Sequence, residues 1–139
     1  MSFCFIILAG GNSHRFRSKV GKPYQKIAGK SLVEINVDKA RKFKQIKKIV
    51  VVYNKKDSKK AKSLKLKNVK LILGGKDRQQ STFNALKKVV EYKEISKVLI
   101  HDVARPNVSI KLLNTIMKKM RKAKAVVPKL DVQDAIKQT

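Results

Sequence analysis

The feature that most constrains the fold is a short apolar segment that runs directly into a pair of glycines. Residues 3–8 read Phe-Cys-Phe-Ile-Ile-Leu, and Ala9-Gly10-Gly11 follows at once. A brief, near-continuous apolar run is typical of a strand that is buried on both faces of a parallel sheet. Paired glycines after such a strand allow backbone N–H groups to approach phosphate oxygens closely. The pattern therefore predicts an α/β fold whose first strand ends at a phosphate-binding turn.

The rest of the chain alternates short apolar runs with segments of helical periodicity. Ser31 and Glu34 form a capping-box pattern at the start of one such segment. We expect further strands at residues 48–53, 69–73, 97–100 and 125–127, and helices at 31–43, 57–64, 78–90 and 109–122. This alternation predicts a Rossmann-like, mostly parallel sheet with helices on both faces, within a single domain over residues 1–139.

The net charge of +26 invites a nucleic-acid interpretation, but the kind of basic residue does not support it. Of the 35 basic residues 29 are lysines, scattered over many segments, whereas base readout and bidentate phosphate recognition favour arginine. Aromatic residues make up only 6% and do not interleave with the basic runs. We expect the lysines to cover solvated helix faces, with no specific nucleic-acid partner. Such a surface still attracts anionic substrates.

Targeting and redox signals are sparse. No apolar run approaches the roughly 18 residues of a membrane span, and the N-terminal run has no basic segment before it, so we expect neither a membrane span nor a signal peptide. The single cysteine, Cys4, excludes an internal disulfide framework and fits a reducing cytoplasm. We therefore expect a cytoplasmic protein in which Cys4 is an inert core residue.

Chemistry-bearing residues follow three of the predicted strands. Gly10 follows the first, Gly74-Gly75 follows the run at 69–73, and Asp102 follows the run at 97–100. In open parallel sheets ligands bind beyond the carboxyl ends of the strands, so we expect these three loops to converge on one crevice. Arg15 and Lys22 add positive charge beside the first loop.

The second and third loops leave alternatives open. Ser81 supplies a hydroxyl, although its loop equally fits a plain turn with a helix cap. Asp102 suits a ribose hydroxyl, a substrate hydroxyl or a metal, and Arg105 suits a second phosphate; alternatively the two form a local ion pair. His101 has no partner at zinc-ligand spacing, so it fits a partly buried structural histidine.

Together these loops resemble the 2-C-methyl-D-erythritol 4-phosphate cytidylyltransferase family of isoprenoid precursor biosynthesis. The resemblance covers the whole chain in order. Its motifs are Leu8-Ala9-Gly10-Gly11 with Arg15, Lys22-Pro23-Tyr24, Gly29-Lys30-Ser31-Leu32, Gly74-Gly75 with Arg78 and Ser81, His101-Asp102 with Ala104-Arg105-Pro106, and Asp134-Ala135-Ile136-Lys137.

The resemblance implies a fold of the nucleotide-diphospho-sugar transferase type and a reaction. CMP passes from CTP to 2-C-methyl-D-erythritol 4-phosphate, pyrophosphate leaves, and Mg²⁺ is held through the CTP phosphates rather than by protein ligands. Arg15 and Lys22 match the catalytic cations. The positions around the nucleotide are Leu8, Ala9, Gly10, Gly11, Gly75, Ser81 and Asp102; Asp102 and Arg105 match the acceptor side.

The family also implies a longer protein. Its members continue well beyond Lys137, into a part that pairs two subunits and completes the acceptor site. On this basis we expect a sheet and an acceptor site that are incomplete at the C-terminus, weak CTP binding and little turnover by this chain alone, and a homodimeric full-length form. The chain also carries Gly21 where a proline commonly precedes the lysine.

Other interpretations remain open at this stage. The first loop also resembles molybdenum-cofactor guanylyltransferases, which the stretch 101–106 argues against, and ribitol phosphate cytidylyltransferases share more of the motifs. A basic nucleic-acid-binding protein and an inactive fragment are the remaining alternatives.

Overall fold

The computed structural model describes residues 1–11 and 21–131. The chain forms two compact units, Met1–Asn107 and Val108–Thr139, and each is described here by itself.

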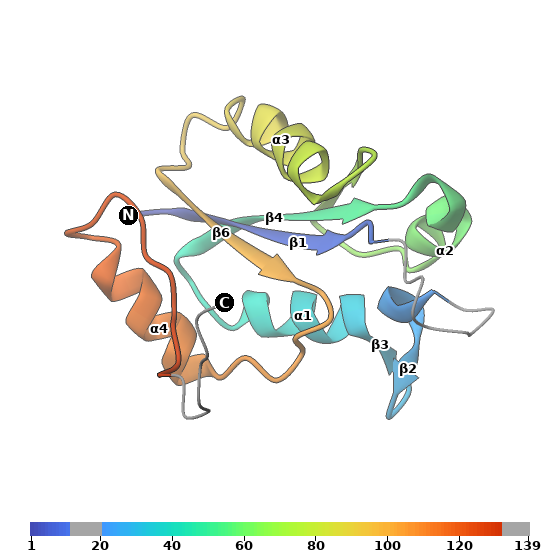
Figure 1. Ribbon diagram of the computed structural model, residues 1–139, viewed down its shortest axis with the longest axis horizontal. Helices are drawn as coiled ribbons and strands as arrows, with labels where there is room; N and C mark the ends of the chain where they lie inside the picture. The colour runs from blue at the N-terminus through green and yellow to red at the C-terminus, as the bar shows by residue number, and fades with distance from the viewer. Residues whose placement is uncertain (12–20, 132–139) are drawn as a thin grey trace, which may run out of the picture. The chain divides into compact units, whose positions relative to one another are not determined.

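A four-stranded parallel sheet forms the centre of the first unit (Figure 1). Its strands are β1 (Phe3–Ala9), β4 (Ile46–Tyr53), β5 (Val69–Leu73) and β6 (Lys97–Asp102), in the order β5-β4-β1-β6. Strand β1 pairs in parallel with both β4 and β6, and β4 pairs in parallel with β5. The four strands predicted in this part of the sequence are confirmed, with boundaries that shift by at most two residues.

One helix covers each face of this sheet (Figure 1). Helix α3 (Arg78–Val89) buries Ala85 and Val89 in one cluster with Cys4, Ile6, Leu8, Val50 and Val52. Helix α1 (Leu32–Arg41) contacts β1 and β4, and its residues Val33 and Val37 are fully buried. The Ser31–Glu34 capping box begins α1 as predicted, with the Glu34 amide 3.2 Å from the Ser31 hydroxyl oxygen.

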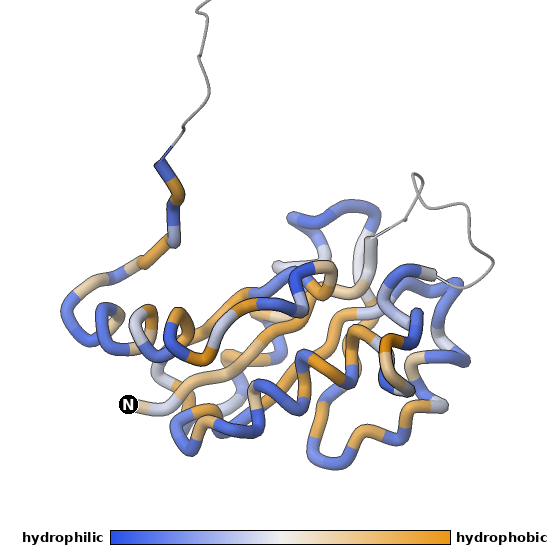
Figure 2. Tube along the Cα trace, turned by 90° about the horizontal axis from the view of Figure 1, so that it is seen from below, coloured by the Kyte–Doolittle hydropathy of each residue, from blue (hydrophilic) through white to orange (hydrophobic). Residues whose placement is uncertain are grey.

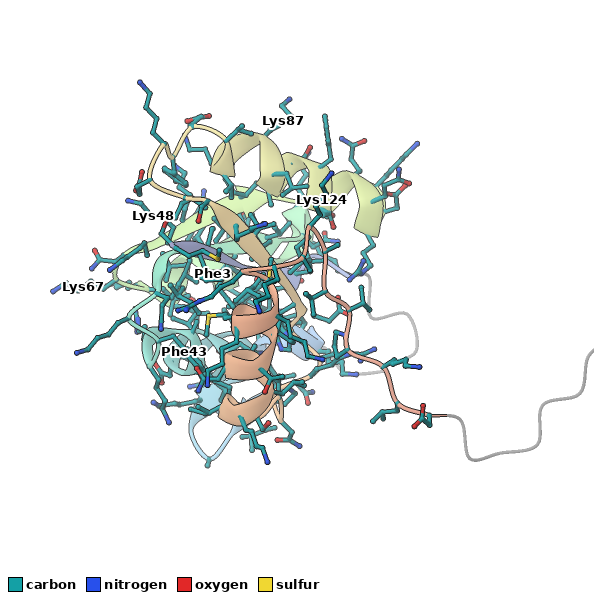
Figure 3. The ribbon with its side chains drawn as sticks, turned by 90° about the vertical axis from the view of Figure 1, so that its left-hand side faces the viewer. Phe3, Phe43, Lys48, Lys67, Lys87 and Lys124 are labelled. Carbon is teal, nitrogen blue, oxygen red and sulfur yellow. The ribbon has the colours of Figure 1, made fainter. Side chains whose placement is uncertain are left out.

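Strand β1 is buried along its whole length, as a strand between two helical layers must be. The tube is orange along the strands and blue over most of the surface loops (Figure 2). Phe3 and Phe43 lie within the molecule, whereas the lysine side chains at 67 and 87 extend outward (Figure 3). Cys4 has no exposed surface, and its burial raises the pKa of the thiol to about 12, which fits the inert core residue we expected.

Short elements connect the longer strands and helices of the first unit. They are the 3₁₀ helices η1 (Lys22–Tyr24) and η2 (Lys55–Asp57), helix α2 (Ser58–Ser63), and a hairpin of β2 (Lys26–Ile27) and β3 (Lys30–Ser31). At the hairpin turn both Ala28 and Gly29 have positive φ, of 49° and 81°. Such a turn favours a two-residue connection between antiparallel strands. The sequence analysis missed this hairpin because Ala-Gly is a weaker turn signal than Asn-Gly.

The second unit holds helix α4 (Ile110–Lys119), which begins as predicted at a Ser109 cap, with the Leu112 amide 3.0 Å from the serine hydroxyl. The strand predicted at residues 125–127 is wrong, because this stretch is irregular and the side chain of Val127 is 83% exposed. Three apolar residues beside a proline supply few ladder hydrogen bonds, and within the described part of the chain no strand pairs with them.

Candidate functional site

The predicted loops meet at one edge of the sheet. Strands β1, β5 and β6 are parallel and end at Ala9, Leu73 and Asp102, so the loops that follow them emerge on the same side. The register aligns Leu8 with Asp102 and Ala9 with Tyr53. This is the carboxyl edge, where ligands of open parallel sheets bind.

The two glycine loops lie against each other and against the end of β4. The Gly74 amide donates to the Tyr53 carbonyl oxygen at 2.8 Å, and the Asn54 side-chain amide donates to the Gly10 carbonyl oxygen at 3.1 Å. A Cβ atom placed on Gly10 would lie only 3.6 Å from the Ser81 hydroxyl. Ser81 is buried and accepts a hydrogen bond from the Gly75 amide at 3.0 Å. The structure therefore brings Gly10, Gly75 and Ser81 together.

Gly75 has no room for a side chain. A Cβ atom there would lie 2.0 Å from Gln80 Cγ and 2.5 Å from Gln80 Cβ. We expect Gly75→Ala to lower the free energy of unfolding by about 1–3 kcal/mol, because the loop or the first turn of α3 must move. Urea unfolding measures this.

The matched control is Gly11→Ala, since no described atom lies within 4 Å of a Cβ at that position. Equal losses in the two variants would show that the space around Gly75 is not the cause.

Asp102 lies between two arginines. Arg78 Nε and an Arg78 terminal nitrogen lie 3.2 and 3.0 Å from the Asp102 Oδ1 atom, and Arg105 Nε lies 3.8 Å from Oδ2. The local ion pair of Asp102 with Arg105 is thus present, although the shorter contact comes from α3. All three side chains are at least partly exposed, so the pairs orient the carboxylate more than they stabilise the fold.

His101 lies between the core strand β1 and the loop that carries Asp102 and Arg105. Its Nε2 atom lies 3.0 Å from the Arg105 carbonyl oxygen, and its ring packs 5.6 Å from the Phe5 ring, centre to centre. Burial lowers the pKa of His101 below its ordinary value, and the hydrogen bond to Arg105 and the charge of Asp102 only partly oppose this. The imidazole is therefore a neutral structural donor, as the sequence indicated.

Because the pKa of His101 is lowered in the folded protein, we expect the free energy of unfolding to depend on pH. The folded protein takes up this proton less readily than the unfolded chain does, so the contribution to stability is complete above about pH 6.5 and is lost as the pH falls through the folded-state pKa. We expect the free energy of unfolding to fall between about pH 7.5 and pH 5.5, and to fall less in His101→Gln. Urea unfolding at both pH values tests this; an unchanged pH dependence in the variant would contradict it.

Lys22 begins the 3₁₀ helix η1, and its side chain is exposed. Within the described ranges no carboxylate pairs with its ammonium group. Gly21 before it has φ −55° and ψ 140°, a conformation that proline also adopts. A Cβ atom on Gly21 would lie 3.2 Å from both carboxylate oxygens of buried Asp57, so this carboxylate lies close to the turn before η1. Arg15 and the stretch 134–137 lie outside the described residues.

Within residues 1–11 and 21–131, no group of three His, Cys, Asp or Glu side chains is arranged to hold a metal ion. Over the same residues, no helix combines the length and the apolar character that crossing a bilayer requires.

Three supporting residues were missed by the sequence analysis: Asn54, Asp57 and Asn36. Asn54 holds Gly10, and Asp57 lies against Gly21. Their only sequence signal was the position of Asn54 and Asp57 just after a predicted strand. Asn36 carried no signal, because its bond to the Val103 carbonyl joins residues that are far apart in the sequence.

A parallel sheet with glycine turns, a buried serine hydroxyl and a carboxylate bonded by arginine at its carboxyl edge is typical of the nucleotidyltransferase-like α/β fold. The profile of the IspD family, 2-C-methyl-D-erythritol 4-phosphate cytidylyltransferase, matches residues 3–139. The chain belongs to this family.

Individual relatives agree. The chain is 46% identical over 138 residues to a "Bifunctional enzyme IspD/IspF" of Pelagibacter ubique, covering 99% of this chain and 37% of that protein. It is 34% identical over 140 residues to a 2-C-methyl-D-erythritol 4-phosphate cytidylyltransferase of Clostridioides difficile, covering 97% and 58%. The structure of the bifunctional IspDF from Campylobacter jejuni matches with a TM-score of 0.81 at 31% identity, covering 99% of this chain and 36% of that one.

The chain thus spans between about one third and three fifths of the length of these proteins. A "Bifunctional ribulose 5-phosphate reductase/CDP-ribitol pyrophosphorylase Bcs1" of Haemophilus influenzae is also similar, at 31% identity over 136 residues, covering 94% of this chain and 29% of that protein.

Proposed function

We propose that this chain forms the CTP-binding domain of a cytidylyltransferase that transfers CMP to 2-C-methyl-D-erythritol 4-phosphate and releases pyrophosphate. The observation that carries the proposal is the meeting of the two glycine loops, Ser81 and Asp102 at one sheet edge, in a chain of this family.

The nucleotide lies along the first two loops. Leu8, Ala9, Gly10 and Gly11 present backbone groups to the ribose and phosphates, and Gly75 presents its backbone to the base. Because the Ser81 oxygen already accepts the Gly75 amide, its own hydrogen is available for the nucleotide. Asp102, with Oδ1 held by Arg78, offers Oδ2 to a hydroxyl group.

The acceptor's phosphate is the nucleophile. Its oxygen attacks the α-phosphorus of CTP in line, and the bond between the α-phosphorus and the oxygen that bridges it to the β-phosphorus breaks, so that pyrophosphate leaves. A phosphate monoester is already anionic at neutral pH, and no general base is required. Catalysis therefore depends on alignment and on stabilising the charge at the reacting phosphorus. Lys22 and Arg15 supply fixed positive charge for this, and Arg105 with Asp102 binds the acceptor.

Mg²⁺ fits this site as an ion carried by the triphosphate. Bound there, Mg²⁺ would supply positive charge that neutralises the phosphate oxygens and the leaving pyrophosphate. The described residues offer backbone donors and cations rather than a carboxylate cluster, so phosphate oxygens are its natural ligands.

We also propose a cytoplasmic location and no specific nucleic-acid partner. Buried Cys4 suits the reducing cytoplasm, and the lysine-rich surface attracts anionic substrates without a specific nucleic-acid partner. The full-length form is a homodimer with a more complete acceptor site.

Pyrophosphate release with CTP and Mg²⁺ tests the function. We expect release with 2-C-methyl-D-erythritol 4-phosphate as acceptor, weak in this chain and stronger in a longer form, and calorimetric binding of CTP in preference to GTP. A preference for GTP would overturn the nucleotide assignment. Submicromolar, strongly salt-dependent duplex binding would instead favour a nucleic-acid function.

The second candidate acceptor is ribitol 5-phosphate, favoured by the similarity to the CDP-ribitol pyrophosphorylase. Both acceptors present a phosphate and hydroxyl groups, which Arg105 and Asp102 recognise alike. Pyrophosphate release measured with each acceptor in parallel distinguishes the two. Faster release with ribitol 5-phosphate would identify it as the acceptor in place of 2-C-methyl-D-erythritol 4-phosphate.

A further inference from the structure

We propose that Asn36 of α1 is a positioning residue for the turn at residues 103–106, and that through this turn it sets the affinity for the acceptor phosphate. The acceptor role of this turn rests on the proposed function. The attachment of the turn to α1 does not.

Asn36 is a buried polar side chain on a helix face that is otherwise apolar. It is 1% exposed and lies on the face of α1 that also buries Val33 and Val37. Its side-chain nitrogen donates to the Leu32 carbonyl oxygen at 2.9 Å and to the Val103 carbonyl oxygen at 3.0 Å. Its Oδ1 atom is buried and has no hydrogen-bond partner among the described residues. A buried unpaired oxygen is costly, whereas an apolar residue here would leave the Val103 carbonyl without its Asn36 donor.

The Val103 carbonyl belongs to a turn that four other hydrogen bonds also restrain. The Val103 amide donates to the Leu8 carbonyl oxygen at 3.2 Å, and the Arg105 amide donates to the Asp102 carbonyl oxygen at 3.1 Å. His101 holds the Arg105 carbonyl oxygen, and the Lys39 ammonium of α1 donates to the Pro106 carbonyl oxygen. Asn36 is the buried member of this set, because Lys39 and His101 both lie nearer the surface.

Asp102 and Arg105 flank this attachment. Since Asp102 precedes Val103 and Arg105 follows it by two residues, movement of the Val103 carbonyl displaces both side chains. A small displacement of a binding group is enough to weaken substrate alignment strongly. Asn36 therefore acts on the substrate through the turn and touches no substrate itself.

The substitution Asn36→Ser is expected to keep the bond to the Leu32 carbonyl and to remove the bond to the Val103 carbonyl. Serine in a helix bonds to the carbonyl four residues earlier, so the Leu32 contact is kept, while its shorter side chain does not span to Val103. The matched control is Val37→Ala, which removes buried volume from the same helix, where Val37 is 0% exposed, without touching the turn.

Two measurements on the chain test this. Amide hydrogen exchange at Val103 and Arg105 is expected to speed up by about tenfold in Asn36→Ser and not selectively in Val37→Ala. In pyrophosphate release, we expect the KM for 2-C-methyl-D-erythritol 4-phosphate to rise by about tenfold in Asn36→Ser, with kcat and the Kd for CTP changed by less than about threefold.

The outcomes are distinguishable. Unchanged exchange at both amides in Asn36→Ser overturns the positioning role, whatever the activity. Faster exchange with an unchanged acceptor KM overturns the link to the acceptor. If neither this chain nor a longer form turns over either acceptor, the proposed function fails, and the exchange measurement alone decides whether Asn36 holds the turn.

Discussion

Replacing Lys22 with alanine is expected to lower the rate of pyrophosphate release by about 10³-fold, because a fixed cation at the reacting phosphorus acts mainly in the transition state. The fold should persist. Lys22 is exposed at the start of η1, whereas the neighbouring Pro23 and Tyr24 are buried and carry the packing of this turn. Steady-state kinetics with CTP and 2-C-methyl-D-erythritol 4-phosphate, alongside thermal unfolding, measures both quantities.

The matched control is Lys26→Ala. Lys26 is an exposed lysine on the nearby strand β2, so it removes the same charge at a short distance along the chain. We expect its rate to stay within about threefold of the unsubstituted protein, since exposed charges away from the reacting groups contribute little. Equal rates for Lys22→Ala and the unsubstituted protein would remove Lys22 from the mechanism.

Phe5→Ala is expected to cost about 3–5 kcal/mol of the free energy of unfolding, the largest loss of stability that we predict. Phe5 is 1% exposed at the middle of the central strand β1, where it aligns with Ile49 on β4 and Leu99 on β6. Its ring also packs against His101. Truncation leaves a cavity between strands and helix that the structure closes only in part.

Phe83→Ala provides the same truncation on the surface. Phe83 lies on α3 and is 55% exposed, so we expect a loss below about 1 kcal/mol. Urea unfolding followed by circular dichroism compares the two variants. A loss below about 1 kcal/mol for Phe5→Ala would contradict the central place of β1 in the core.

The elements that the sequence predicted well are those whose signal is local. Strand β1 is a continuous apolar run, and α1 begins at a capping box formed by residues three apart. Residues 125–127 show the limit of this approach, because an apolar run becomes a strand only when a partner strand offers hydrogen bonds. No such pairing can be read from three residues alone.

The site divides in the same way. Glycines and charged residues at strand ends identified the loops, because a parallel sheet collects its strand ends at one edge. The contacts that hold these loops join residues far apart in the chain, such as Arg78 with Asp102 and Asn54 with Gly10. The spacing of residues in a single sequence does not indicate such long-range pairs, so these contacts could be identified only from the structure.

The order of the strands has a consequence for synthesis on the ribosome. β1 emerges first, yet it occupies an interior position of the sheet and pairs with β4 and with β6, whose residues 97–102 are translated last among the strands of the described residues. Strand β1 gains β4 as a partner once residues 46–53 have been made, but its other edge stays unpaired until β6 follows, after more than two thirds of these residues. Delayed, non-local pairing slows folding and exposes a sticky segment meanwhile. The net charge of +26 makes nascent chains repel one another, which opposes aggregation during this interval.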